Sequence, residues 1–148
     1  MGDIKKYEQH KAGIIPYYIE DNLIYMMFMI PSNPLYGGSQ PQIAKGLLEE
    51  TEISNNQFID AAIREGTEEL GLRIDNIVSV NKIWDKRSIF KKSISNFKVY
   101  SALIKDKDKF DPFHYETGET VWLTDQNFSK EVRFDHIPIV FSLIRSVA

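Results

Sequence analysis

The chain has 148 residues, which predicts one domain over residues 1–148. It is 43% hydrophobic and 26% charged, as expected of a globular fold, and its net charge of −3 gives no overall basic bias toward nucleic acid. The absence of cysteine excludes disulfides, thiolate chemistry and cysteine-bound zinc, and it suits a reducing cytoplasm. The longest apolar run, at 23–30, is too short to span a bilayer, so we expect a cytoplasmic protein with no membrane partner.

The N-terminal third predicts a hairpin followed by a loop. Apolar runs at 13–20 and 23–30 flank Asp21 and Asn22, two residue types that favour a turn between strands. Residues 31–46 contain three prolines and three glycines, so we expect a loop over that range.

A helix is predicted from residue 54. Ser54 with Gln57 fits a capping box at its start, and Gly71 stands where a helix-ending glycine belongs. One face of this helix is expected to pack on the core. That face consists of Phe58, Ile59, Ala62, Ile63, Gly66 and Leu70.

The C-terminal half predicts three more strands and a final helix. Strands are expected at 77–84, 93–104 and 120–124, and a helix is entered through Pro138. Strands and helices mix without a regular alternation. The sequence therefore indicates an α+β or mixed α/β fold with a mixed sheet.

The stretch "REGTEE" at 64–69 gathers three carboxylates, Glu65, Glu68 and Glu69, onto one side of the predicted helix. Like charges four positions apart repel, and Gly66 costs about 0.5–1 kcal/mol of helix stability relative to alanine. One interpretation is a solvated helix face. The other is a site for a hard cation such as Mg²⁺, which takes carboxylate oxygens and substrate phosphates as ligands.

The sequence "REGTEELGL" at 64–72 resembles the second half of the Nudix box. Upstream, "KGLLEETE" at 45–52 is similar to its first half, with Gly46 and Glu52 at motif positions and Glu49 at a position often occupied by glutamate. Two features depart from the family pattern. Eleven residues separate Glu52 from Arg64, where the family usually has seven, and a glycine stands at position 66 instead of a bulky apolar residue.

The resemblance implies a Nudix fold, an α/β/α sandwich around a mixed sheet. It also implies hydrolysis of a nucleoside diphosphate linked to another group, with Mg²⁺ or Mn²⁺ as cofactor. Arg64 is expected to orient the glutamates through a salt bridge, and a later loop offers Glu116 or Glu119, of which the spacing to Trp122 favours Glu116. The implied metal ligands are Gly46 through its carbonyl, Glu65, Glu68, Glu69 and Glu116, and the implied catalytic residues are the same four glutamates with Arg64.

The segment "PLYGGSQPQIAKG" at 34–46 resembles phage-encoded members of the family that act on dinucleoside polyphosphates and ADP-ribose. "FDH" at 134–136 is similar to a stretch of ADP-ribose-type members, and it also fits a helix start capped by Asp135. Lys45 is expected to contact the substrate. Tyr36 and Tyr115 are expected to stack on a base, although single aromatic residues near strands are also typical of a core.

Two alternative functions stay open: removal of caps or pyrophosphate from RNA 5′ ends, and nucleotide sensing without catalysis. The RNA 5′-end alternative predicts a role for a basic segment. This segment either steers polyphosphates toward the site or consists of solvated lysines. Its basic residues are Lys82, Lys86, Arg87, Lys91, Lys92, Lys98, Lys105, Lys107 and Lys109. The expected partner is a small nucleotide, and both an RNA 5′ end and a homodimer are compatible with the sequence. The three histidines show no metal-ligand spacing, so none is assigned a role.

Overall fold

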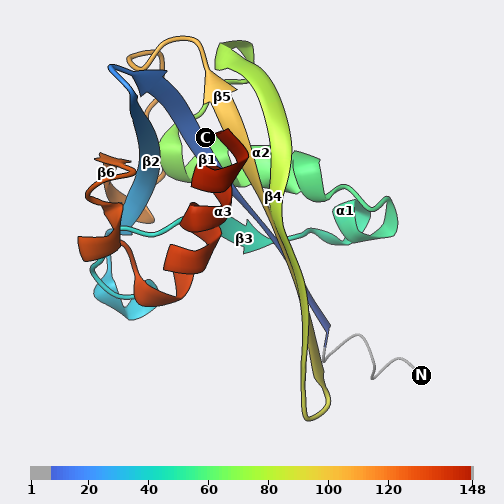
Figure 1. The fold of residues 1–148 in the computed structure, drawn as a ribbon. Coiled ribbons are helices and arrows are strands. Elements are labelled where there is room, and N and C mark those ends of the chain that lie inside the picture. The colour runs from blue at the N-terminus through green and yellow to red at the C-terminus, as the bar shows by residue number, and fades with distance from the viewer. Residues whose placement is uncertain (1–7, 148) are drawn as a thin grey trace.

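The computed structural model describes residues 8–147 and begins with the predicted hairpin (Figure 1). Strand β1 (Glu8–Glu20) turns at Asp21 and Asn22 into the antiparallel strand β2 (Leu23–Pro31). Both turn residues have positive φ, 52° and 65°. This conformation matches the right-handed twist of the flanking strands, and aspartate and asparagine tolerate it better than most residues. The predicted hairpin is therefore confirmed.

The strands form one mixed sheet, as predicted, and their order is β4-β5-β1-β2-β6. Strand β5 (Ser93–Ile104) runs parallel to β1, and its other neighbour, β4 (Ile77–Phe90), is antiparallel to it. Strand β6 (Thr117–Thr124) pairs with β2 at the opposite edge. The predicted strands at 77–84 and 120–124 are present but longer than expected, whereas 93–104 has the predicted bounds.

The predicted loop over 31–46 is wrong at its C-terminal end. A short 3₁₀ turn, Pro34–Tyr36, interrupts the loop, and strand β3 (Ala44–Leu47) then pairs antiparallel with the first half of β1. β3 is too short to show an alternating pattern in the sequence. The hydrogen bonds that β1 offers, rather than local propensity, make it a strand.

The predicted helix start is also wrong. Helix α1 (Glu50–Ser54) is separate from α2 (Phe58–Leu70), because Asn56 between them has φ 54° and breaks the helical path. The capping box belongs to α1 and joins Glu49 to Glu52 instead of Ser54 to Gln57. The eleven residues between Glu52 and Arg64 thus hold the end of α1, a turn and the first half of α2. Helix α2 ends as predicted, with Gly71 in a left-handed conformation at φ 74°.

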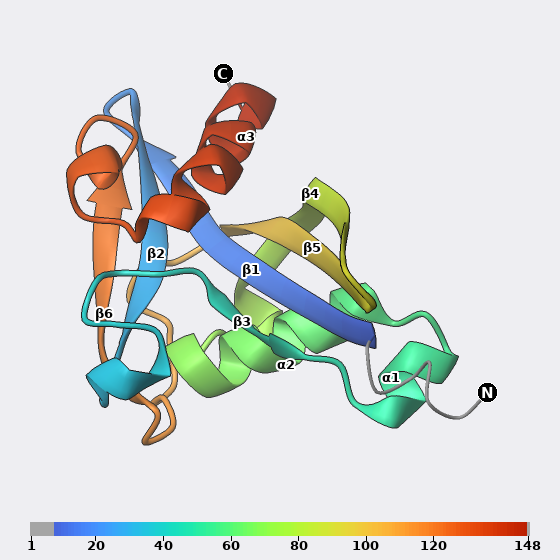
Figure 2. The same ribbon diagram turned by 90° about the horizontal axis from the view of Figure 1, so that it is seen from below.

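Side chains alternate between two cores on opposite faces of the sheet. On β1, Ala12 and Ile14 join the core under α2, whereas Ile15 and Tyr17 join the core under α3 (Ile137–Val147). Figure 2 shows the two helices on opposite sides of the strands. The predicted three-layer arrangement is confirmed. None of the helices within residues 8–147 combines the length and apolar character needed to cross a bilayer.

Gly66 lets α2 approach β1 closely. A Cβ added at this position would lie 2.7 Å from Ile14 Cγ2 and 3.0 Å from Leu72 Cδ2. Both side chains are fully buried, so neither can move freely out of the way. The close approach explains why a glycine interrupts an otherwise helix-favouring stretch.

We therefore expect Gly66→Ala to lower the free energy of unfolding by about 1–3 kcal/mol, the usual cost of overpacking. This loss would exceed the gain of about 1 kcal/mol that alanine brings to helix propensity. Urea unfolding measures the change, with Asp60→Ala on the exposed side of α2 as a control expected to stay within about 1 kcal/mol of the parent. An alanine variant as stable as the parent would show that Ile14 shifts without cost.

Candidate active site

Strand β3 and helix α2 meet at Gly46 and Glu65. Glu65 is 7% exposed, and a Cβ added at Gly46 would overlap its carboxyl group. Only glycine leaves room for a buried carboxylate at this crossing. The two halves of the motif, nineteen positions apart in the sequence, therefore touch directly.

Arg64 joins the acidic residues of α1 and α2 into one network. Its Nε and Nη2 donate to the two carboxylate oxygens of Glu52 at 3.1 and 2.9 Å, and its Nη1 donates to Glu65 Oε1 at 2.9 Å. Nη2 also donates to the Leu47 carbonyl at 3.2 Å. The hydrogen bonds from Arg64 keep the pKa of Glu52 below its usual value. The four added residues thus do not remove Glu52 from the site.

Glu68 lies at the edge of this network. Its carboxylate is 3.7 Å from Arg64 Nη1, and 39% of its side chain is exposed. The predicted ion pairs of Arg64 with the glutamates of α2 are present for Glu65 and Glu68. Glu69 is placed differently, because the Lys45 amide donates to its Oε1 at 3.3 Å.

Burial makes the Glu65 and Glu69 carboxyls costly to ionise together. It raises the pKa of Glu65, which the Arg64 guanidinium partly opposes. For Glu69, burial and the nearby Glu65 carboxylate raise the pKa to about 8. Two neighbouring carboxylates with this mutual effect need a proton or a cation to balance their charge.

The donor set fits a divalent metal ion. Carboxylates and a backbone carbonyl are the hard oxygen ligands that Mg²⁺ and Mn²⁺ prefer, and the raised pKa of Glu69 marks an unbalanced negative site. Within residues 8–147, no three His, Asp or Glu side chains stand close enough together to form a metal site as they are arranged. In this arrangement the Glu65 and Glu68 carboxylates form ion pairs with Arg64.

Glu116 reaches the site because a loop is anchored to the end of α2. The His114 amide donates to the Glu68 carbonyl at 2.8 Å, and the Thr117 hydroxyl donates to the Glu69 carbonyl at 2.9 Å. These bonds satisfy carbonyls that a helix end leaves without partners. Beside them lies a pocket of about 190 Å³. It is lined by Met29, Pro31, Gln42, Lys45, Glu69 and Glu116.

Lys45 places a positive charge in the same pocket. Burial, followed by the nearby Arg133, lowers the pKa of its ammonium group. A partly buried lysine beside another cation is well placed to receive an anion such as a phosphate. The predicted substrate residue therefore lies beside Glu69.

No family model matches the sequence, and no curated protein matches it either. Solved structures do match over nearly the whole chain. A Caenorhabditis elegans Ap4A hydrolase in a binary complex is 16% identical with a TM-score of 0.72, covering 94% of this chain and 97% of that one. The NUDIX domain of Shewanella oneidensis NrtR, complexed with ADP ribose, is 12% identical with a TM-score of 0.75, covering 95% and 89%. The chain has the Nudix fold. RenU, a Nudix hydrolase from M. smegmatis, is also similar, at 12% identity and a TM-score of 0.68 over 93% of this chain and 84% of that one.

Within this Nudix fold, the predicted stacking residue Tyr115 lies outside the pocket. Tyr115 is 85% exposed and is not among the residues that line it. The backbone of Tyr36 belongs to the 3₁₀ turn, and its side chain lies outside the part that the structure describes. Glu119, the alternative to Glu116, pairs with Ile30 within the sheet and does not line the pocket.

His136 is a residue that the sequence analysis missed. It is buried, its Nδ1 accepts the Ile43 amide at 3.1 Å, and burial lowers its pKa to about 3. The neutral ring fixes the chain just before β3 and Gly46. The stretch "FDH" at 134–136 was the sequence signal that could have identified His136. Asp135, the predicted helix cap, instead receives two hydrogen bonds from Arg133 at 2.6 Å.

The basic segment does not form one patch over this site. Lys82 and Lys98 flank Asp85, Lys107 pairs with Glu20, and Lys109 pairs with Asp75. Lys86 and Arg87 lie in the half of β4 nearest the β4–β5 turn, and Lys91 and Lys92 form that turn. The steering of substrate toward the glutamates by this segment stays a prediction.

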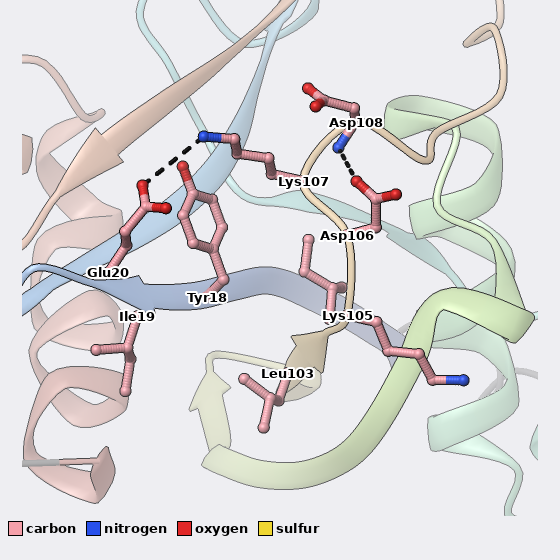
Figure 3. A pocket seen from close by; sticks show the side chains of 9 residues that line it. Tyr18, Ile19, Glu20, Leu103, Lys105, Asp106, Lys107 and Asp108 are labelled. Carbon is pink, nitrogen blue, oxygen red and sulfur yellow. Dashed lines mark hydrogen bonds and ion pairs between the residues drawn. The ribbon is translucent and has the colours of Figure 1, made fainter.

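A larger, open pocket of about 540 Å³ lies at the ends of β1 and β5 (Figure 3). Lys107 crosses it, with Nζ 3.7 Å from Glu20 and 5.9 Å from the centre of the Tyr18 ring. The Tyr18 ring stacks on Tyr25 at 4.8 Å. Tyr18 and Lys107 are thus engaged with their neighbours, and the pocket contains none of Glu65, Glu68 and Glu69.

Proposed function

We propose that the protein is a divalent-cation-dependent hydrolase that cleaves the diphosphate bridge of a nucleoside diphosphate linked to another moiety. The observation that carries the proposal is the contact of buried Glu65 with Gly46, held by Arg64 beside Glu69, in a fold shared with an Ap4A hydrolase. These are the residues that the resemblance to the Nudix box assigns to metal binding and catalysis. Dinucleoside polyphosphates and ADP-ribose are the favoured substrates.

Glu65, Glu68, Glu69, Glu116 and the Gly46 carbonyl would hold Mg²⁺ or Mn²⁺. A bound divalent cation would neutralise charge on the phosphate oxygens and favour deprotonation of the attacking water. Arg64 keeps the carboxylates of α1 and α2 in place through paired hydrogen bonds. Lys45 would attract the phosphates toward Glu69, and Glu116 would face them from the loop, since all three side chains line one pocket.

Product analysis tests this proposal. Purified protein is incubated with diadenosine tetraphosphate, ADP-ribose and 5′-triphosphorylated RNA, with Mg²⁺, Mn²⁺ or excess EDTA, and the products are separated by chromatography. We expect nucleoside monophosphate from one of the first two substrates and none with EDTA. Faster turnover of the RNA would favour the RNA 5′-end alternative. Nucleotide binding without any product would support a sensor and overturn the proposal.

Stability without a divalent cation is expected to fall as pH rises from 7 to 9. Glu69 binds its proton more tightly in the folded state, with a pKa of about 8 against an ordinary value of 4.5. Its stabilising contribution is complete below pH 4.5 and is lost as pH rises through 8. The expected loss is about 1 kcal/mol between pH 7 and pH 9. His136 does not mask it, because a histidine is neutral in the folded and unfolded chain above pH 7.

Thermal melts at pH 7 and pH 9, with EDTA or 10 mM Mg²⁺, measure this effect. Mg²⁺ should raise the melting temperature more at pH 9, where the carboxylates are ionised and bind it without losing a proton. A melting temperature that is independent of both pH and Mg²⁺ would contradict the assignment of Glu69 to a cation site.

A further inference from the structure

The far end of the β4–β5 hairpin projects beyond the rest of the sheet (Figure 1). Ile89 is 66% exposed and Phe90 is 74% exposed, and the turn itself is Lys91-Lys92, with φ 55° at Lys91. The hairpin closes with Ile89 opposite Ile94 and Phe90 opposite Ser93. Large exposed apolar side chains at a projecting turn indicate a contact surface.

This end of the hairpin is also strongly basic. Residues 86–98 carry five positive charges and no negative one, so the rest of the chain has a net charge of −8. Lys98 lies near Asp85, but Lys86, Arg87, Lys91 and Lys92 have no ion-pair partner among residues 8–147. Concentrated positive charge on an otherwise acidic protein favours a polyanionic partner.

The order of the side chains distinguishes between two polyanions. Lys91 and Lys92 form the apex, and Phe90 and Ile89 lie behind them. Insertion of the apolar pair into a lipid surface would carry both ammonium groups toward the hydrocarbon, which is costly. A strand of nucleic acid needs no insertion, because its phosphates can meet the lysines while a base stacks on the exposed phenyl ring.

Lys91 Nζ lies 5.6 Å from the centre of the Phe90 ring, so a cation and an aromatic face are already adjacent. This pairing is suited to one phosphate and one base of the same strand. We propose that the end of the β4–β5 hairpin, comprising Phe90, Lys91 and Lys92, binds single-stranded nucleic acid. The surface is separate from the pocket beside Glu69, so the proposal does not depend on the proposed hydrolase function.

Fluorescence anisotropy with 5′-labelled twelve-nucleotide oligo-uridine and oligo-thymidine tests the proposal. Lys91→Glu/Lys92→Glu is expected to weaken binding at least tenfold in 50 mM salt, and Phe90→Ala about fivefold or more. In the double variant, the slope of log affinity against log salt should become shallower by about 1.4, because two phosphate contacts are lost.

The matched control is Lys105→Glu/Lys130→Glu, which changes the net charge by the same amount on exposed residues away from the hairpin. Figure 3 shows Lys105 extending away from its neighbours. The control should bind at least three times more tightly than Lys91→Glu/Lys92→Glu. Equal losses in the two double variants would show that only net charge matters and would overturn the proposal.

Two further outcomes would also overturn it: no oligonucleotide binding by the parent protein in 50 mM salt, or binding only to phosphatidylserine vesicles. Melting curves establish that each variant is folded. Hydrolysis of ADP-ribose and diadenosine tetraphosphate by Lys91→Glu/Lys92→Glu should equal that of the parent. A variant that loses oligonucleotide binding but keeps hydrolysis, or one that keeps binding but loses hydrolysis, therefore tests this proposal and the proposed function separately.

Discussion

Glu69→Gln is expected to slow turnover by about 10²–10³-fold, the usual effect of removing one electrostatic stabiliser of a transition state. Glutamine keeps the size and helix propensity of the side chain but cannot supply an anionic oxygen to a cation. Without metal, the variant should be at least as stable as the parent, because Glu69 is partly buried beside Glu65 and its pKa of about 8 indicates that its charge is unfavourable there. The substitution thus separates catalysis from stability.

Initial rates with ADP-ribose and diadenosine tetraphosphate, together with melting curves at pH 7 and pH 9, measure both effects. The melting temperature of the variant in EDTA should lose most of its dependence on pH in this range, and Mg²⁺ should raise it less than in the parent. Glu50→Gln is the matched control, since Glu50 is an exposed residue of α1. If Glu69→Gln retains activity within a few-fold of the parent, the crowded carboxylates of α2 do not serve a cation.

The sheet was predictable because its strands carry their own signals. Asp21 and Asn22 identify a turn, and alternating residues in 93–104 identify a strand with the observed bounds. β3 carries no such signal, because four residues become a strand only where β1 supplies the partner. The break between α1 and α2 had a local signal in consecutive Asn55 and Asn56, since asparagine accepts positive φ. The apolar periodicity of α2 obscured it.

The candidate site was predictable at positions where only one residue type fits the available space. Gly46, which matches the Nudix box, leaves space for the Glu65 carboxyl, and Gly66, which departs from it, leaves space for Ile14. The position of Glu116 depends on hydrogen bonds from His114 and Thr117 to the end of α2. Hydrogen bonds between residues that are far apart in the sequence leave no periodic pattern from which they could be predicted. His136 escaped prediction for the same reason, because its partner Ile43 lies more than ninety positions away.

Arg64→Ala is expected to reduce both activity and stability. The side chain bonds Glu52 and Glu65, which are both buried, and its removal would leave two carboxylates without their cation. Breaking a buried pair in this way costs about 3–5 kcal/mol. Because Arg64 is 26% exposed and water can replace part of the interaction, we expect about 3 kcal/mol, at the lower end of that range. Turnover should fall about 10²-fold or more, since the glutamates lose the group that orients them.

Arg64→Lys distinguishes orientation from charge. Lysine restores the positive charge but cannot donate simultaneously to both oxygens of Glu52, to Glu65 and to the Leu47 carbonyl, as the guanidinium does. We expect Arg64→Lys to recover part of the lost stability in urea unfolding and little of the lost kcat. If lysine restores turnover fully, the charge of Arg64 suffices and its hydrogen-bond geometry is not needed for catalysis. If Arg64→Ala itself melts and turns over like the parent, then Glu52 and Glu65 do not need the guanidinium, and the network around Arg64 is surface charge alone.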